Sequence, residues 1–353
     1  MSADLFVADH FFEPIFLGPD HILQLSVFMV AACSIILGVS CHGGSFMLSI
    51  LKYIIQLCFM WEINDPESLC QRDKKLLLGF PINPRSIKAK FHLESKHTIY
   101  TVCPNEACHT TYKLKFQDNK PIPIYPTQCT QTRFSKACKE FLLYPQDIGG
   151  ETISLPIKPF VYFDFKYWVG GLARPGFEDK MDSAWNTTDP AIDHMHDIFD
   201  GEVLCNFSGP DGKHFSVGGE EGHYVFSLCV DFFNPLSNKQ AGKKISVGLI
   251  SLVCLNLPPE LQYKPENMFL TGVIPHEPPL NALNHYLTPL VDSLLNFWNP
   301  GVCFTCTEVY PWGQLICCTL VSCLLCMWSP NRSRNGWFCC QQPQSFLCNL
   351  SLH

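Results

Sequence analysis

The sequence predicts a mixed α/β protein, and three stretches of the chain carry that prediction. Two long apolar stretches occupy 22–61, paired cysteines lie between strand-like runs at 97–138, and two further strand-like runs lie at 224–256. The 353 residues are enough for about two domains with a sizeable core. Because 47% of the residues are hydrophobic and only 16% are charged, the composition is typical of a globular protein rather than a disordered one.

The charge balance and the cysteines limit the function classes. A formal net charge of −7 means that the chain as a whole has no excess of basic residues for binding phosphates. Any nucleic-acid binding must therefore be local or depend on metal ions. Twenty cysteines would suit a secreted disulfide protein, but the first twenty residues carry acids and lack the basic start of an export signal. We therefore expect reduced thiols or metal ligands rather than disulfides.

The N-terminal apolar stretches predict two helices. The first, 22–39, is uncharged and at the lower edge of transmembrane length, whereas the second, 46–61, is interrupted by Lys52. They form either a membrane hairpin or a pair of core helices joined at CHGGS (41–45), where two glycines supply the turn. No basic cluster flanks either end to orient a membrane span. Core helices are the favoured interpretation, and no membrane partner is expected.

Four cysteines predict a structural metal site in a small β unit. Cys103 and Cys108 enclose a tight turn, and Cys129 and Cys138 follow, with spacings C-x4-C and C-x8-C that are looser than the usual C-x2-C. Two pairs of thiolates that flank a hairpin resemble a tetrahedral zinc ribbon. His109 is the alternative fourth ligand if Cys138 lies too far away. The competing interpretation is four ordinary cysteines.

The run 224–230 predicts a buried strand that ends on Asp231, and a second strand is expected at 245–256, before Pro258-Pro259. A carboxylate held at a sheet edge suits Mg²⁺, which prefers oxygen ligands in nearly fixed geometry. On position alone, however, Asp231 is expected to do no more than cap the strand.

Two other patterns carry weaker metal predictions. The cluster DHMHD (193–197) alternates imidazoles and carboxylates but is expected to be a solvated loop or helix end. The pairs Cys303-x2-Cys306 and Cys323-x2-Cys326 match a zinc spacing. Because the second pair lies in an apolar run without a turn former, we do not expect a site there.

Several long stretches resemble the transposase of En/Spm-class (CACTA) DNA transposons, in the form found in fungal genomes. They include PIKPFVYFDFKYWVGGLARPGFEDKMDSAW (156–185), IFDGEVLCNFSGPDGKHFSVG (198–218) and the run from 224 to 275 that begins YVFSLCVDFFNP. The upstream AKFHLESKHTIYTVCPNEACHTTYK (89–113) and the later 285–305 are similar as well.

The resemblance implies a ribonuclease-H-like catalytic core, in which an acidic triad holds two Mg²⁺ or Mn²⁺ ions, cuts DNA and joins the freed 3′ hydroxyl to target DNA. It implies DNA as partner, allows self-association and places the protein in the nucleus. Asp231 matches the first triad acid, on the first strand of the core, and thereby becomes a candidate catalytic metal ligand.

The chain departs from this family after the helix at 285–298. The family continues into a strand and a second acid in an Asp-x-Pro-Ala stretch, but no Asp or Glu follows Glu308 here. We therefore expect a truncated transposase-like protein that is inactive alone. The alternatives are a non-catalytic zinc ribbon that binds nucleic acid or protein, and a membrane protein anchored by 22–61. In the ribbon, charge would come from surrounding lysines: Lys113, Lys115, Lys136 and Lys139.

The predicted fold is thus mixed α/β, with N-terminal helices, a small zinc-ribbon-like β unit and an incomplete ribonuclease-H-like α/β core. The expected domain boundaries are an N-terminal helical region (1–95), the ribbon (96–145), a connector (146–221), the partial core (222–320) and an aberrant cysteine-rich tail (321–353).

Overall fold

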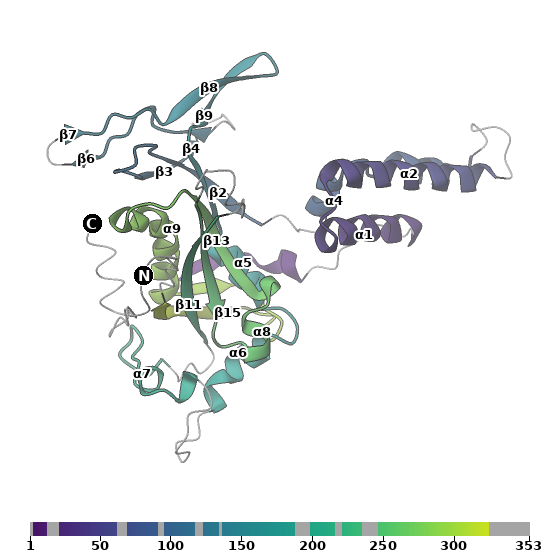
Figure 1. The fold of residues 1–353 in the computed structure, drawn as a ribbon. Coiled ribbons are helices and arrows are strands. Elements are labelled where there is room, and N and C mark those ends of the chain that lie inside the picture. The colour runs from purple at the N-terminus through teal and green to yellow at the C-terminus, as the bar shows by residue number, and fades with distance from the viewer. Residues whose placement is uncertain are drawn as a thin grey trace. The chain divides into compact units, whose positions relative to one another are not determined.

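A computed structural model describes most of the chain and divides it into two compact units (Figure 1). One unit is His10–Ser95, and the other combines Met1–Asp9 with Lys96–His353. The described residues are 3–12, 21–61, 69–90, 95–116, 123–133, 136–187, 198–215, 221–234 and 246–324. The predicted cluster at 193–197 and the tail after 324 lie outside these ranges.

The smaller unit is helical. Its helices are α1 (His21–Ile36), α2 (Cys41–Met60), α3 (Gln71–Gly79) and α4 (Pro84–Lys90). Their common core is built from aliphatic residues and one aromatic residue: Val27, Val30, Ala31, Leu48, Ile55, Leu76, Phe80 and Ile87. Apolar residues recurring at helical spacing form this core, as the periodicity predicts.

The turn between α1 and α2 does not use the two glycines that the sequence indicated. The chain reverses at 37–40, where Gly38 has φ +64° and Ser40 caps α2 by accepting the N–H of Gly43. Gly43 and Gly44 lie inside the first turn of α2. A Cβ on Gly44 would come within 2.5 Å of Pro84, so this glycine serves close packing of α2 on α4.

Helix α2 is buried on only one face. Gly44, Leu48 and Ile55 are buried, whereas the opposite side exposes several large apolar side chains: Phe46, Ile50, Tyr53, Ile54 and Leu57. The expectation that both helices are core helices is therefore met only on the face that packs inward. By length and composition α2 is long and apolar enough to cross a membrane, a weak indication that core helices of soluble proteins also give.

The larger unit is built around a nine-stranded sheet. Its spatial order is β1-β14-β15-β11-β12-β13-β10-β2-β3. In that order the strands are Asp4–Phe6, Val302–Phe304, Gln314–Leu324, Gly222–Phe233, Val247–Cys254, Met268–Pro275, Pro159–Phe163, His97–Val102 and Thr111–Lys113. β1 pairs with β14 and β11 with β15 in parallel, while the other neighbours are antiparallel.

The central strand β11 follows from its apolar sequence, because Tyr224, Val225 and Phe226 are completely buried. Strands β11 and β12 form the predicted antiparallel pair, with Asp231 opposite Leu249. The sequence predicted that this strand ends at Asp231, but β11 is longer. It continues to Phe233 because Phe232 packs over Gly248, where a Cβ would lie 2.4 Å from the ring.

Helix α9 (Leu280–Trp298) covers part of the sheet and contacts β15 and α5 (Phe165–Leu172). Phe165 is fully buried at the centre of the aromatic core, and its ring lies 5.2–5.4 Å from those of Phe226, Phe269 and Phe297. Asp164 starts α5 by accepting the N–H of Tyr167.

Smaller elements fill the connections. A β-hairpin of β8 (Leu143–Ile148) and β9 (Glu151–Pro156) turns at Gly149-Gly150, both with positive φ. The remaining short strands are β4 (Lys115–Phe116), β5 (Pro123–Ile124), β6 (Thr132–Arg133) and β7 (Lys136–Ala137). The remaining helices are η1 (Asp9–Phe11), α6 (Glu178–Ser183), η3 (Ala184–Thr187), η4 (Ile198–Asp200), α7 (Glu202–Cys205), α8 (Pro259–Gln262) and η6 (Pro265–Asn267). Thus segments expected to form separate ribbon and connector regions supply β2, β3 and β10 to the main sheet.

Candidate metal centre and Asp231

The four predicted cysteines lie on two hairpins at one side of the sheet. Cys103 and Cys108 occupy the turn between β2 and β3, where the N–H of Cys103 donates to the carbonyl of Thr110. Cys129 and Cys138 flank β6 and β7, where the N–H of Cys138 donates to the carbonyl of Gln131. These backbone bonds draw each pair together across its turn.

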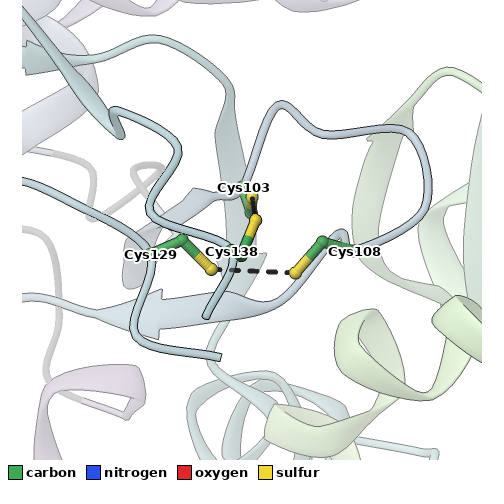
Figure 2. A group of neighbouring side chains, drawn as sticks. All are labelled: Cys103, Cys108, Cys129 and Cys138. Carbon is green, nitrogen blue, oxygen red and sulfur yellow. Dashed lines mark hydrogen bonds between the residues drawn. The ribbon is translucent and has the colours of Figure 1, made fainter. Parts of the chain in front are cut away.

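The structure brings all four sulfur atoms to one point (Figure 2). The Sγ atoms of Cys103 and Cys138 are 3.6 Å apart, those of Cys108 and Cys129 are 3.7 Å apart, and all four lie within 4.8 Å of one another. A tetrahedron with Zn–S bonds of about 2.3 Å has edges of about 3.8 Å. Disulfide sulfurs would be only about 2.05 Å apart. The four free thiols can therefore hold a metal ion such as zinc.

His109 is not needed as a fourth ligand, because Cys138 is close enough. The Nδ1 atom of His109 lies 3.1 Å from the hydroxyl of Tyr286 and 3.2 Å from Nζ of Lys158. Burial first, and the charge of Lys158 second, lower the pKa of His109 to about 4. The imidazole is therefore neutral and engaged with the protein.

Hydroxyl groups beside two of the sulfurs act in favour of the thiolate form. Burial opposes ionisation of Cys108, but hydrogen bonds with the hydroxyl and N–H of Thr110, and with the sulfurs of Cys129 and Cys103, lower the pKa of Cys108 on balance. Burial raises the pKa of Cys129, while the hydroxyl of Tyr112, 3.2 Å from the sulfur, acts to lower it. Donors of this kind orient metal ligands and tune their basicity.

Burial also raises the pKa of Cys103 well above its ordinary range, opposed by the N–H of Asn105. Lys158 is the cation beside this sulfur: burial lowers the pKa of Lys158, and Cys103 and Glu106 raise it. A metal bound by four thiolates carries net negative charge, which the Lys158 ammonium would offset. Sequence inspection missed Thr110, Tyr112 and Lys158. Only Thr110, two residues after Cys108, had a local signal.

The cysteine hairpins are attached to helix α9. Besides the contact between His109 and Tyr286, the hydroxyl of Thr111 donates to the carbonyl of His285 over 2.9 Å. The ring of Tyr286 also meets Phe160 of β10 edge-on at 5.1 Å. Helix α9 also contacts β15, the strand beside β11, so it connects the four-cysteine centre to that part of the sheet.

Asp231 lies at the other candidate site. Its neighbour Val230 is buried, and Asp231 itself is exposed because successive residues of a strand face opposite sides. Cys229 pairs with Leu324 in the parallel β11–β15 ladder, so Asp231 lies two residues past the last registered pair. Among the described residues the four cysteines form the only group of three or more histidine, cysteine, aspartate or glutamate side chains close enough to share an ion. Asp231 is therefore not joined there by the further ligands of a triad.

The second zinc-like spacing is not assembled in the described part of the chain. Cys306 lies near Asp9, with its sulfur 3.5 Å from Oδ1, and Cys303 lies in β14. Cys323 lies in β15 opposite Leu228, and Cys326 falls outside the described residues.

Residues 199–320 match the family model described as Transposase family tnp2. The matched stretch contains β11, β12, β13, α9, β14 and most of β15, with Asp231 inside it. It supports a transposase family and a transposase-like role, and a transposase family indicates DNA as the partner. No curated protein matched the chain.

Proposed function

We propose that this chain is a transposase-like protein of the En/Spm class, in which Asp231 is the first ligand of a two-metal, ribonuclease-H-like core acting on nuclear DNA. The observation that carries the proposal is the strand order within the matched stretch. β11, β12 and β13 form an antiparallel meander, and after α9 the chain returns as β15, parallel to β11 and directly beside it.

This topology favours a shared site at one edge of the sheet. The carboxyl ends of parallel neighbours meet at the same edge, so β15 ends near Asp231, with its last residue Leu324 paired to Cys229. In the resembling family a second acid follows the strand that comes after this helix. Divalent ions held there would activate the attacking oxygen and stabilise the leaving one.

Residues 309–353 contain no Asp or Glu that could supply this second acid. Asp231 alone supplies too few ligands for two Mg²⁺ ions, since each ion is commonly held by one or two carboxylates together with substrate phosphates. We therefore propose that the protein binds DNA but does not cut it alone.

Plasmid nicking by the full chain, with Mg²⁺ or Mn²⁺, tests both parts. We expect wild type and Asp231→Asn to be equally inactive, and Mn²⁺ binding measured by electron paramagnetic resonance to weaken in Asp231→Asn but not in Asp292→Asn. Nicking that Asp231→Asn abolishes would overturn the inactivity while supporting the core. The role of Asp231 would be overturned if Asp231→Asn still nicked the plasmid. It would also be overturned if Mn²⁺ bound equally well to wild type and Asp231→Asn.

The cysteine centre supports a second candidate function, a zinc-stabilised module that binds nucleic acid without catalysis. The four-sulfur geometry favours zinc, and four exposed lysines lie on or next to the cysteine hairpins: Lys113, Lys115, Lys136 and Lys139. Phosphate contacts by these lysines would give strongly salt-dependent binding.

Fluorescence anisotropy with duplex DNA at several salt concentrations tests this module. Replacing all four lysines by glutamate should weaken binding and reduce the salt slope by up to about 3.6, at about 0.9 for each lost phosphate contact. Lys213→Glu, an exposed lysine on a distant turn, is the matched control. Unchanged binding in the fourfold variant would exclude the ribbon as the DNA contact and leave the proposal for Asp231 untouched.

A further inference from the structure

A second group of polar side chains lies between helix α6 and the starts of β11 and β15. Glu178 and Asp182 are one turn apart on α6 and so share a helix face. Glu178 is 0% exposed, and Gln314, the first residue of β15, is 4% exposed. Tyr224, near the start of β11, completes the group.

Part of this group is satisfied by the protein. Oε2 of Glu178 accepts the N–H of Val309 over 2.7 Å, and the hydroxyl of Thr307 also bonds to this carboxylate. Oδ1 of Asp182 accepts the hydroxyl of Tyr224 over 3.0 Å, and the side chain of Gln314 hydrogen bonds to Asp182.

Two buried oxygens of the group are left without a hydrogen-bond partner among the described residues: Oε1 of Glu178 and Oε1 of Gln314. Gln314 Oε1 and the Tyr224 hydroxyl both lie beside Gly222. A Cβ atom on Gly222 would be 3.4 Å from the first and 2.9 Å from the second. Oxygen atoms from α6, β11 and β15 thus lie in the interior around this group.

The charges of this group are not balanced by a described basic residue. None of the described ion pairs includes Glu178 or Asp182, although His223 acts to lower the pKa of Asp182. Asp179, an exposed acid between them, adds repulsion. Buried carboxylates are normally paired with a cationic group or coordinate a metal.

We propose that Glu178, Asp182 and Gln314 form a binding site for a hard divalent cation of the Ca²⁺ and Mg²⁺ class. The donors are all oxygens, which such ions prefer, and two carboxylates match a charge of +2. The bound ion would tie α6 to the 305–313 loop and to the first residue of β15, and thereby hold β15 beside β11.

This site is separate from Asp231 and does not depend on the proposed function. Tyr224 and Asp231 are seven positions apart on one strand, which corresponds to about 23 Å at about 3.3 Å for each residue. The two positions lie near opposite ends of β11.

Terbium luminescence tests the proposal on the full chain, because Tb³⁺ replaces Ca²⁺ at oxygen sites and Tyr224 adjoins Asp182 as a sensitiser. We expect sensitised emission from wild type that Ca²⁺ displaces, and an affinity at least about tenfold lower in Glu178→Gln and Asp182→Asn. Asp179→Asn, on the same helix, and Asp231→Asn should behave like wild type.

Gln314→Glu keeps the test decisive if the first two variants fail to fold. It adds a third carboxylate and should bind Tb³⁺ at least about tenfold more tightly. The absence of sensitised emission from wild type would overturn the proposal, as would a Gln314→Glu affinity equal to that of wild type. Stability that depends on pH but not on Ca²⁺ would also overturn it, because a proton would then replace the cation.

Discussion

Replacing Cys103 by serine should remove the metal from the four-cysteine centre. Cys103 is completely buried, and its sulfur is 3.6 Å from that of Cys138, so it supplies one corner of the tetrahedron. A serine hydroxyl is a poor zinc ligand and is not ionised at neutral pH, and three remaining thiolates leave the ion open to water. We expect zinc content to fall from about one equivalent to near zero.

The loss of the metal should also destabilise the larger unit. The cysteines form most of a small core with Leu142, so loss of the metal would weaken the contact between the two hairpins. A ligand that binds only the folded state contributes about 2.7 kcal/mol when its free concentration is about one hundred times the dissociation constant. Urea unfolding with excess zinc should therefore show a loss of about that size in Cys103→Ser, whereas wild type should show it only after chelation.

Cys70→Ser is the matched control. Cys70 is exposed, caps α3 by accepting the N–H of Asp73, and lies in the other compact unit, and serine is a good capping residue. It should leave zinc content and stability unchanged. If Cys103→Ser kept one equivalent of zinc, or if Cys70→Ser lost it equally, the four-sulfur assignment would be wrong.

Three further outcomes are expected. Phe165→Ala should lower the free energy of unfolding by about 3–5 kcal/mol in urea, because it empties the centre of the aromatic core, and a loss below about 1 kcal/mol would contradict that placement. Tyr112→Phe removes the hydroxyl beside Cys129 and should weaken zinc retention about tenfold against a chromophoric chelator, with unchanged affinity excluding this donor role. Burial raises the pKa of Glu178, so the stability linked to its protonation is present below the ordinary glutamate range and is lost as pH rises through the raised pKa. With divalent ions chelated, the stability of Glu178→Gln relative to wild type should therefore increase with pH in urea titrations, and a constant difference would contradict the buried carboxylate.

The sequence correctly predicted the helices and strands that depend on interactions between residues close together in the chain. The helices near 22–39 and 46–61 and the strand pair around Asp231 all occur, because hydrophobic periodicity and turn formers act within a few residues. Errors arose where a distant contact decides. The α1–α2 turn lies at Gly38, whereas Gly44 packs against Pro84 from within α2, and β11 runs past Asp231 to where Phe232 covers Gly248.

The candidate sites show the same division. Paired spacing singled out Cys103, Cys108, Cys129 and Cys138, and the structure brings their sulfurs together. Lys158 is remote in sequence from these cysteines, and nothing local marks it as the neighbouring cation. Glu178 and Asp182 also had no motif, since an acid becomes informative only when its burial and its missing partner are known.

The sequence by itself singled out the candidate residues: the four cysteines by their spacing and Asp231 by its place in a stretch that resembles a transposase family. Only the tertiary structure decided how these parts are joined, with β15 parallel to β11 and the cysteine hairpins fastened to α9 through Tyr286. The physical reason is that side-chain type and short-range periodicity can be determined from residues that are adjacent in the chain. Strand order, burial and charge compensation depend on residues far apart in the chain.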